Sequence, residues 1–298
     1  MTAPAPARGL IDLLRLPYWL MTGGLSVLTA FAISKHPLSL SVQTVQTVLL
    51  IFFSMAFITS AGFAINDYFD RESDALIKPK RPIPSGALSL RQAVAVSSVL
   101  FAAGLVMAFR INWLSFVIIA ADSALLLVYS MFVKRKSGFA ANVLVGILTG
   151  TAFLYGQATI SNPPIVSIIS LSLYPIALGT IGGNVLRDVL SLEGDSKTGY
   201  PTLPQKIGVG NSAKVAAGFF LLTGLLAPLP FFIGNFSVYY LLAILVWSVL
   251  LIYSSIRLAT SEPTLLNVRK YERIVTMSMI LLPLALIIQA LSNVGGLL

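Results

Sequence analysis

The sequence predicts an all-α, polytopic membrane protein, a bundle of nine transmembrane helices with a cytoplasmic N-terminus. Three observations support this prediction. First, 56% of the 298 residues are hydrophobic and only 10% are charged, whereas a soluble domain carries about 25% charged residues. Second, the chain contains long apolar segments. Third, its basic residues alternate between loops in a regular way.

Nine segments approach the roughly 20 apolar residues that a helix needs to cross a bilayer. They cover residues 17–34, 45–65, 93–109, 113–132, 140–160, 165–186, 213–233, 238–256 and 274–291. The residues before them, 1–8, are short and rich in proline and alanine, with no cleavage site of the signal-peptide kind. We therefore read the first segment as a retained transmembrane helix.

The basic residues predict the orientation. Of the 20 Lys and Arg residues, all but Lys35 and Arg110 fall at the N-terminus, in the even-numbered loops or at the adjoining helix ends. By the positive-inside rule these parts are cytoplasmic. Ten of the 11 acidic residues lie on the same side, the exception being Asp122. The net charge of +9 thus reflects topology and not nucleic-acid binding, and the chemistry belongs to the cytoplasmic face.

The composition also excludes several kinds of site. There is no cysteine, and His36 is the one histidine. Thiolate metal ligands, disulfides and cysteine nucleophiles are therefore impossible, and a histidine-built metal site or a Ser-His-Asp triad is nearly excluded. Acidic and amide side chains remain as the candidates for chemistry.

A first acidic motif follows the second apolar segment. Asn66, Asp70 and Asp74 recur every four residues, and Asp67 lies beside them. On a helix such a spacing places the side chains on one face. Oxygen ligands of this kind suit Mg²⁺, which is typically held by carboxylates together with substrate phosphate oxygens.

A second acidic motif follows the sixth segment. Asp188, Ser191 and Asp195 fall at i, i+3 and i+7, which again predicts one helical face. Glu193 points elsewhere unless Gly194 breaks the helix. Both motifs end segments that lead to the cytoplasm, so they can face each other. Crowded carboxylates repel one another unless cations neutralise them, so two such clusters indicate a metal–diphosphate site. The alternative is a pair of solvated helix ends matched to local Lys and Arg.

Basic residues near the motifs can complete a diphosphate site, since Lys and Arg stabilise phosphate oxygens and a departing diphosphate. They also have a simpler explanation, as topology signals or contacts to anionic lipid. The candidates are Lys78, Lys80, Arg81, Lys134, Arg135, Lys136, Arg187, Lys197 and Lys206.

These residues carry a family resemblance. Asn66-Asp67-x-x-Asp70-x-x-x-Asp74 with Lys80-Arg81-Pro82-Ile83-Pro84-Ser85-Gly86 resembles the first signature of the UbiA superfamily of intramembrane prenyltransferases. Asp188 with Glu193-Gly194-Asp195, then Thr202-Leu203-Pro204 and Gly208, resembles the second. The resemblance covers nearly the whole chain, so residues 1–298 are expected to form one domain of this kind.

The resemblance implies Mg²⁺-dependent transfer of a prenyl group from an allylic diphosphate to a lipophilic acceptor. The implied metal ligands are Asn66, Asp70, Asp74, Asp188 and Asp195, and the four aspartates among them would be catalytic. Asn66, Asp67, Lys80 and Arg81 would contact the diphosphate, with Tyr129, Ser130 and Lys134, which fall where the superfamily places a Tyr-Ser pair and a nearby lysine.

Within the superfamily, Asn142 and the stretch Leu148-Thr149-Gly150-Thr151-Ala152-Phe153 resemble archaeal digeranylgeranylglyceryl phosphate synthases. This implies geranylgeranyl diphosphate as donor, geranylgeranylglyceryl phosphate as acceptor, and a place in the cytoplasmic membrane. Ser191 stands where the second signature usually has Asp, as it also does in chlorophyll synthases. An aromatic-ring or chlorophyllide-type acceptor therefore stays open. Outside the superfamily, a secondary transporter or a CDP-alcohol phosphotransferase would also be polytopic.

Overall fold

The computed structural model describes residues 6–34, 41–160, 175–233 and 236–295. Throughout these ranges every regular element is a helix. The chain divides into two units. Unit 1 comprises Met1–Val27 and Leu40–Phe132, and unit 2 comprises Leu28–Ser39 and Val133–Leu298.

Eight helical segments in the described ranges are long and apolar enough to cross a membrane. They coincide with eight of the nine predicted spans, namely Pro6–Ile33, Val42–Ile77, Leu90–Ile111, Trp113–Lys136, Gly138–Ala158, Leu203–Phe232, Val238–Thr260 and Leu265–Asn293. The other predicted span, 165–186, lies partly outside the described residues, and its described part belongs to α10 (Pro175–Leu190). The all-helical membrane architecture is confirmed, and the count of nine stays a prediction.

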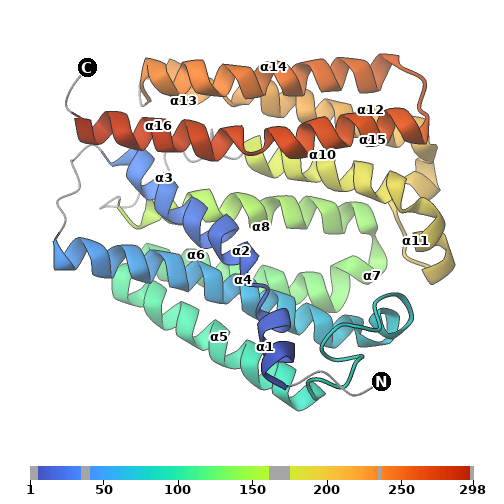
Figure 1. The fold of residues 1–298 in the computed structure, drawn as a ribbon, viewed down its shortest axis with the longest axis horizontal. Coiled ribbons are helices and arrows are strands. Elements are labelled where there is room, and N and C mark those ends of the chain that lie inside the picture. The colour runs from blue at the N-terminus through green and yellow to red at the C-terminus, as the bar shows by residue number, and fades with distance from the viewer. Residues whose placement is uncertain (1–5, 35–40, 161–174, 234–235, 296–298) are drawn as a thin grey trace. The chain divides into compact units, whose positions relative to one another are not determined.

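Unit 1 is organised around α4 (Val42–Ile77), which packs against α5 (Leu90–Ile111) and α6 (Trp113–Val128), as Figure 1 shows. Small polar side chains hold α4 and α5 together. The Ser54 hydroxyl donates to the Gly104 carbonyl over 2.9 Å, and the Ser97 hydroxyl donates to the Ala61 carbonyl over 2.9 Å. Such residues let helix backbones approach closely where lipid provides no hydrophobic driving force.

The N-terminal segment contains the predicted first span, residues 17–34, as a contiguous run of helical residues from Pro17 to Ile33, with one more helix before it. It consists of α1 (Pro6–Leu14), α2 (Pro17–Trp19), the π-helical turn η1 (Leu20–Gly24) and α3 (Leu25–Ile33). Arg15 separates the first two with φ of 50°, a left-handed conformation that ends a helix. The Trp19 indole donates to the Ser60 hydroxyl over 2.6 Å, which fastens this segment to α4.

Unit 2 packs α8 (Gly138–Ala158), α10, α12 (Leu203–Leu226), α14 (Val238–Thr260), α15 (Leu265–Ser278) and α16 (Leu281–Gly295) against one another. Two glycines permit its closest crossings. A Cβ on Gly146 would lie 2.5 Å from Ile181 Cγ1, and one on Gly182 would lie 2.8 Å from Phe220 Cε1. Any larger residue there would push α8 or α12 away from α10, which carries Asp188 of the second acidic motif.

Candidate active site

The first motif lies on an unbroken helix. α4 is 36 residues long, so at 1.5 Å per residue it extends over about 54 Å, well beyond the hydrocarbon thickness of a bilayer. Its C-terminal part therefore continues past the apolar stretch and carries Asn66, Asp67, Asp70 and Asp74. The prediction that this motif shares one continuous helix is confirmed.

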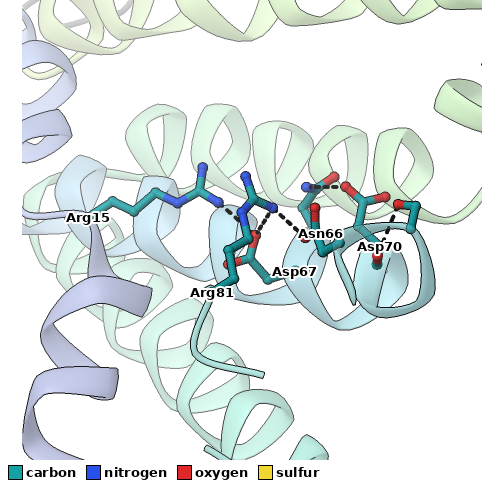
Figure 2. A network of polar contacts seen from close by, with 7 residues as sticks. Arg15, Asn66, Asp67, Asp70 and Arg81 are labelled. Carbon is teal, nitrogen blue, oxygen red and sulfur yellow. Dashed lines mark hydrogen bonds and ion pairs between the residues drawn. The ribbon is translucent and has the colours of Figure 1, made fainter. Parts of the chain in front are cut away.

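Two of its carboxylates are paired with arginines. Asp67 is only 3% exposed, and its Oδ1 accepts from Arg15 Nη2 at 2.6 Å and from Arg81 Nη1 at 2.9 Å. Arg81 Nη1 also donates to Asp74 Oδ2, and Asp74 is likewise buried. Figure 2 shows both guanidinium groups turned toward α4. Because an unpaired buried charge is strongly destabilising, these contacts hold α1, α4 and the following loop together.

The other two polar residues of the motif pair with each other. Asn66 Nδ2 donates to Asp70 Oδ2 over 2.9 Å (Figure 2). This contact turns Asn66 Oδ1 into a buried position where no donor from the described residues reaches it. A buried oxygen without a partner is unfavourable unless a ligand completes it. An amide oxygen beside a carboxylate fits a hard cation such as Mg²⁺.

The loop after α4 places Arg81. Lys78 ends the helix by donating its backbone N–H to the Asp74 carbonyl over 2.8 Å, and the loop then closes on itself, with Leu88 N donating to the Pro82 carbonyl over 3.0 Å. The loop rests on α1 at Gly9, where a Cβ would lie 2.8 Å from Ala87 Cβ. Leu88 shares a buried cluster with Leu13, Ala64 and Ala93.

An open pocket of about 440 Å³ lies between α1, α4 and this loop. Its lining residues are mostly charged: Asp12, Arg15, Tyr18, Asp67, Lys78, Lys80, Arg81 and Pro82. The sequence predicted Asp67, Lys80 and Arg81 as site residues but missed the part played by Arg15 and Asp12, which lie more than 50 positions before Asp67. An arginine ahead of the first span was visible, but only the fold could show which carboxylate it meets.

The second motif is built differently from its prediction. α10 ends at Leu190, and a separate helix, α11 (Leu192–Thr198), begins after Ser191. The break therefore falls at Ser191 and not at Gly194, so Asp188 and Asp195 do not share one continuous helical face as the spacing predicted. The Ser191 hydroxyl donates a hydrogen bond to Asp195 Oδ2 across the break. Ser191, which stands where the signature usually has Asp, therefore contacts another residue of the motif.

Asp188 is held by a neutral partner. Asn142 Nδ2, on α8, donates to Asp188 Oδ2 over 2.7 Å. The sequence singled out Asn142 through its family resemblance without connecting it to the motif. Arg187, a candidate for the diphosphate site, instead donates to Asn184 Oδ1 over 3.0 Å and lies 3.7 Å from Glu272 on α15.

The remaining predicted residues lie at the end of the fourth span. Tyr129 and Ser130 belong to the π-helical turn η2 (Tyr129–Val133), and Lys134 begins α7 (Lys134–Lys136). Ser130 is 2% exposed, and its Oγ has no hydrogen-bond partner in the described part of the chain. Turns of this kind are often found at functional sites.

Within the described ranges, no three or more Asp, Glu, His or Cys side chains gather closely enough to hold a metal ion. In unit 1, Asp67 and Asp74 both pair with Arg81. Asn66 and Asp70 lie side by side through their hydrogen bond, and Asn66 Oδ1 has no partner among the described residues. The convergence of the two motifs on shared Mg²⁺ stays a prediction.

Comparison with known proteins defines the class. The family model described as the UbiA prenyltransferase family matches residues 22–287. The chain belongs to this family and is an intramembrane prenyltransferase with several membrane-spanning helices. This separates it from the transporter and phosphotransferase alternatives.

Two relatives with the same enzyme name are similar to this chain over most of its length. A digeranylgeranylglyceryl phosphate synthase of Natronomonas pharaonis is 38% identical over 239 residues, which cover 80% of this chain and 82% of the relative. One of Haloquadratum walsbyi is 35% identical over 234 residues, covering 78% and 79%.

Solved structures share the fold. One described as a digeranylgeranylglyceryl phosphate synthase in membranes has a TM-score of 0.83 at 28% identity and covers 96% of this chain and 99% of its own. A UbiA homologue from Archaeoglobus fulgidus bound to GPP and Mg²⁺ has a TM-score of 0.70 at 20% identity, covering 96% and 99%, and supports the fold alone.

Proposed function

We propose that this chain is a Mg²⁺-dependent digeranylgeranylglyceryl phosphate synthase acting in archaeal ether-lipid synthesis. The observation that carries the proposal is the 38% identity to a synthase of that name over about four fifths of both chains. A prenyl donor and a glyceryl phosphate acceptor agree with a site that combines oxygen ligands with a basic pocket.

The reaction joins geranylgeranyl diphosphate to geranylgeranylglyceryl phosphate. The bond between C1 of the allylic donor and its diphosphate oxygen breaks, and the diphosphate leaves with the electron pair. The free glycerol hydroxyl of the acceptor attacks C1, a carbon–oxygen ether bond forms, and the hydroxyl proton is released. The allylic cation is stabilised by resonance, so little activation of the hydroxyl is needed. An apolar bundle favours this transfer over hydrolysis because it excludes water.

The proposed metal ligands are Asn66, Asp70, Asp188 and Asp195, with Asp74 sharing its carboxylate between the metal and Arg81. Bound Mg²⁺ would neutralise the charge that develops on the departing diphosphate. Asn66 Oδ1, which has no donor among the described residues, is the strongest candidate in the first motif. Asn142 orients Asp188, and Ser191 orients Asp195, through the hydrogen bonds they make.

Tyr129, Ser130 and Lys134 are the proposed contacts of the donor diphosphate. The buried, unpartnered hydroxyl of Ser130 supports its place in this set. In keeping with the distribution of basic residues, we place the N-terminus and the active site on the cytoplasmic side of the cell membrane, within one domain formed by residues 1–298.

The test is an acceptor screen. Purified protein in detergent receives geranylgeranyl diphosphate, Mg²⁺ and, in turn, geranylgeranylglyceryl phosphate, an aromatic ring acid or a chlorophyllide, and product masses are measured. We expect the mass of the diether phosphate with the first acceptor alone, and none when Mg²⁺ is removed by a chelator. Prenylation of a ring acceptor instead would overturn the assignment.

A further inference from the structure

One face of α15 carries a stripe of exposed cationic and apolar side chains. Leu266, Lys270, Arg273 and Met277 follow one another at intervals of four, three and four residues, which places them along one side of the helix. Leu266 and Met277, at the two ends of this stripe, are 78% and 65% exposed. Because α15 begins one of the candidate membrane spans, Leu265–Asn293, this face is turned toward lipid, with its two cations near the membrane boundary.

The end of α14, which packs beside α15 (Figure 1), adds a third cation to this stripe. Arg257 Nε donates to the Tyr271 hydroxyl over 3.2 Å, and Lys270 Nζ lies 5.5 Å from the centre of the same ring. Because Tyr271 is buried, its ring holds the two cations at one place where the helices meet. A guanidinium has five N–H donors in a fixed fork. Those on the Nη atoms of Arg257 have no acceptor in the part of the chain that the structure describes, so they remain for a ligand.

The cations of this region outnumber its carboxylates. From residue 257 to residue 273 the sequence holds four cationic side chains, Arg257, Arg269, Lys270 and Arg273, and two acidic ones, Glu262 and Glu272. Glu272 lies 3.7 Å from Arg187 on α10 and accepts from the Thr276 hydroxyl, so its charge is matched there. Among the described residues none of the four cations forms an ion pair. α12 and α16, which pack against α14, carry no acidic residue. Even with Glu262 counted against one cation, an excess of three positive charges remains.

We propose that this basic patch, formed by Arg257, Lys270 and Arg273, binds the phosphate of an anionic membrane lipid. The free side of the Arg257 fork suits two phosphate oxygens, and the other two cations balance the remaining charge. The hydrocarbon chains of the lipid then lie along the exposed apolar side chains next to the cations, Tyr253 and Ile256 on α14 and Met277 on α15. A small soluble anion would gain nothing from these apolar side chains, which favours a lipid as the ligand.

The arrangement of the cations goes beyond what membrane topology requires. Cations that only set the orientation of a helix need to lie on one side of the membrane and need no fixed geometry. Here Arg257 and Lys270, from two different helices, converge on the buried ring of Tyr271. A lipid phosphate bound between them would hold α14 and α15 together without involving the prenyl donor or its acceptor.

The test measures the unfolding temperature of the full chain in a neutral detergent as phosphatidylglycerol is added. A ligand that binds the folded state raises this temperature, so we expect a saturable rise with phosphatidylglycerol and none with phosphatidylcholine or inorganic phosphate. The test variant combines Lys270→Gln with Arg273→Gln, because both side chains are exposed and the hydrogen bond of Arg257 stays in place. The lipid concentration for the half-maximal rise should increase about fivefold for each cation removed, or about 25-fold in this variant.

The matched control combines Arg91→Gln with Arg110→Gln, which removes the same charge from exposed positions on α5. It should change the half-maximal lipid concentration by less than about twofold, because those cations lie outside the patch. An equally large change in the control would overturn the proposal, since net charge alone would then attract the lipid. An unchanged half-maximal concentration in the test variant would overturn it too, as would an equal rise with phosphatidylcholine or inorganic phosphate.

Discussion

The two acidic motifs differ in the partners of their buried carboxylates. In the first, buried Asp67 and Asp74 are neutralised by the guanidinium groups of Arg15 and Arg81. In the second, the partner of Asp188 is the neutral amide of Asn142. The positive charge of an arginine neutralises a carboxylate without a metal ion, whereas a neutral amide that donates a hydrogen bond leaves the negative charge of the carboxylate in place. We therefore expect that part of the first motif serves mainly to stabilise the fold, and that the second motif requires a bound cation to balance its charge.

The largest expected effect is on Asp70, the carboxylate of the first motif that accepts a hydrogen bond from Asn66. Asp70→Ala should lower kcat by about 10³-fold, the loss expected when a group that stabilises developing charge is removed. The unfolding midpoint in detergent should change little, because the ion pairs around Asp67 remain. Labelled geranylgeranyl diphosphate gives the rate, and activity within tenfold of wild type would argue against Asp70 as a metal ligand.

Arg81→Met should have the next largest effect, and it should fall on stability. It leaves Asp67 and Asp74, which are 3% and 4% exposed, without the cation they share. Removing one partner of a buried ion pair costs about 3 kcal/mol, and chemical or thermal unfolding in detergent measures it. Adding Asp74→Asn should restore part of the loss, and an additive double mutant would contradict the pairing.

Asn142→Ala is the matched change in the second motif. It removes one hydrogen bond to a carboxylate, so stability should fall by about 2 kcal/mol, less than for Arg81→Met. The Mg²⁺ concentration for half-maximal rate should rise about tenfold, since residues that orient a metal ligand contribute on this scale. If the Mg²⁺ concentration for half-maximal rate stays the same in Asn142→Ala, Asn142 does not support metal binding.

The smallest effect is expected at Ser191. Ser191→Ala removes the hydroxyl that donates to Asp195 and should raise the half-saturating Mg²⁺ concentration only about threefold, because this hydrogen bond is exposed to solvent. Ser191→Asp introduces the residue that is usual in the signature and should lower that concentration. The two variants changing it in the same direction would show that Ser191 does not act through metal binding.

Much of this molecule could be predicted from local sequence. Apolar run length predicted eight helices that the structure describes, and the four-residue spacing correctly placed Asn66, Asp70 and Asp74 along α4. The break at Ser191 escaped the same reasoning, because a periodic spacing does not show where a helix stops. The pairing of Arg15 with Asp67 was equally hidden, since it joins residues 52 positions apart. Which carboxylates pair with arginine, and which remain candidates for metal binding, depends on such tertiary contacts.

The contrast between the motifs is tested most directly by the unfolding temperature in detergent, measured with inorganic diphosphate and increasing Mg²⁺. A cation that binds the folded state raises this temperature. We predict that Asp188→Asn loses most of the Mg²⁺-dependent rise, and that Asp67→Asn keeps it relative to its own lower baseline. A full rise in Asp188→Asn, or its loss in Asp67→Asn, would contradict the account.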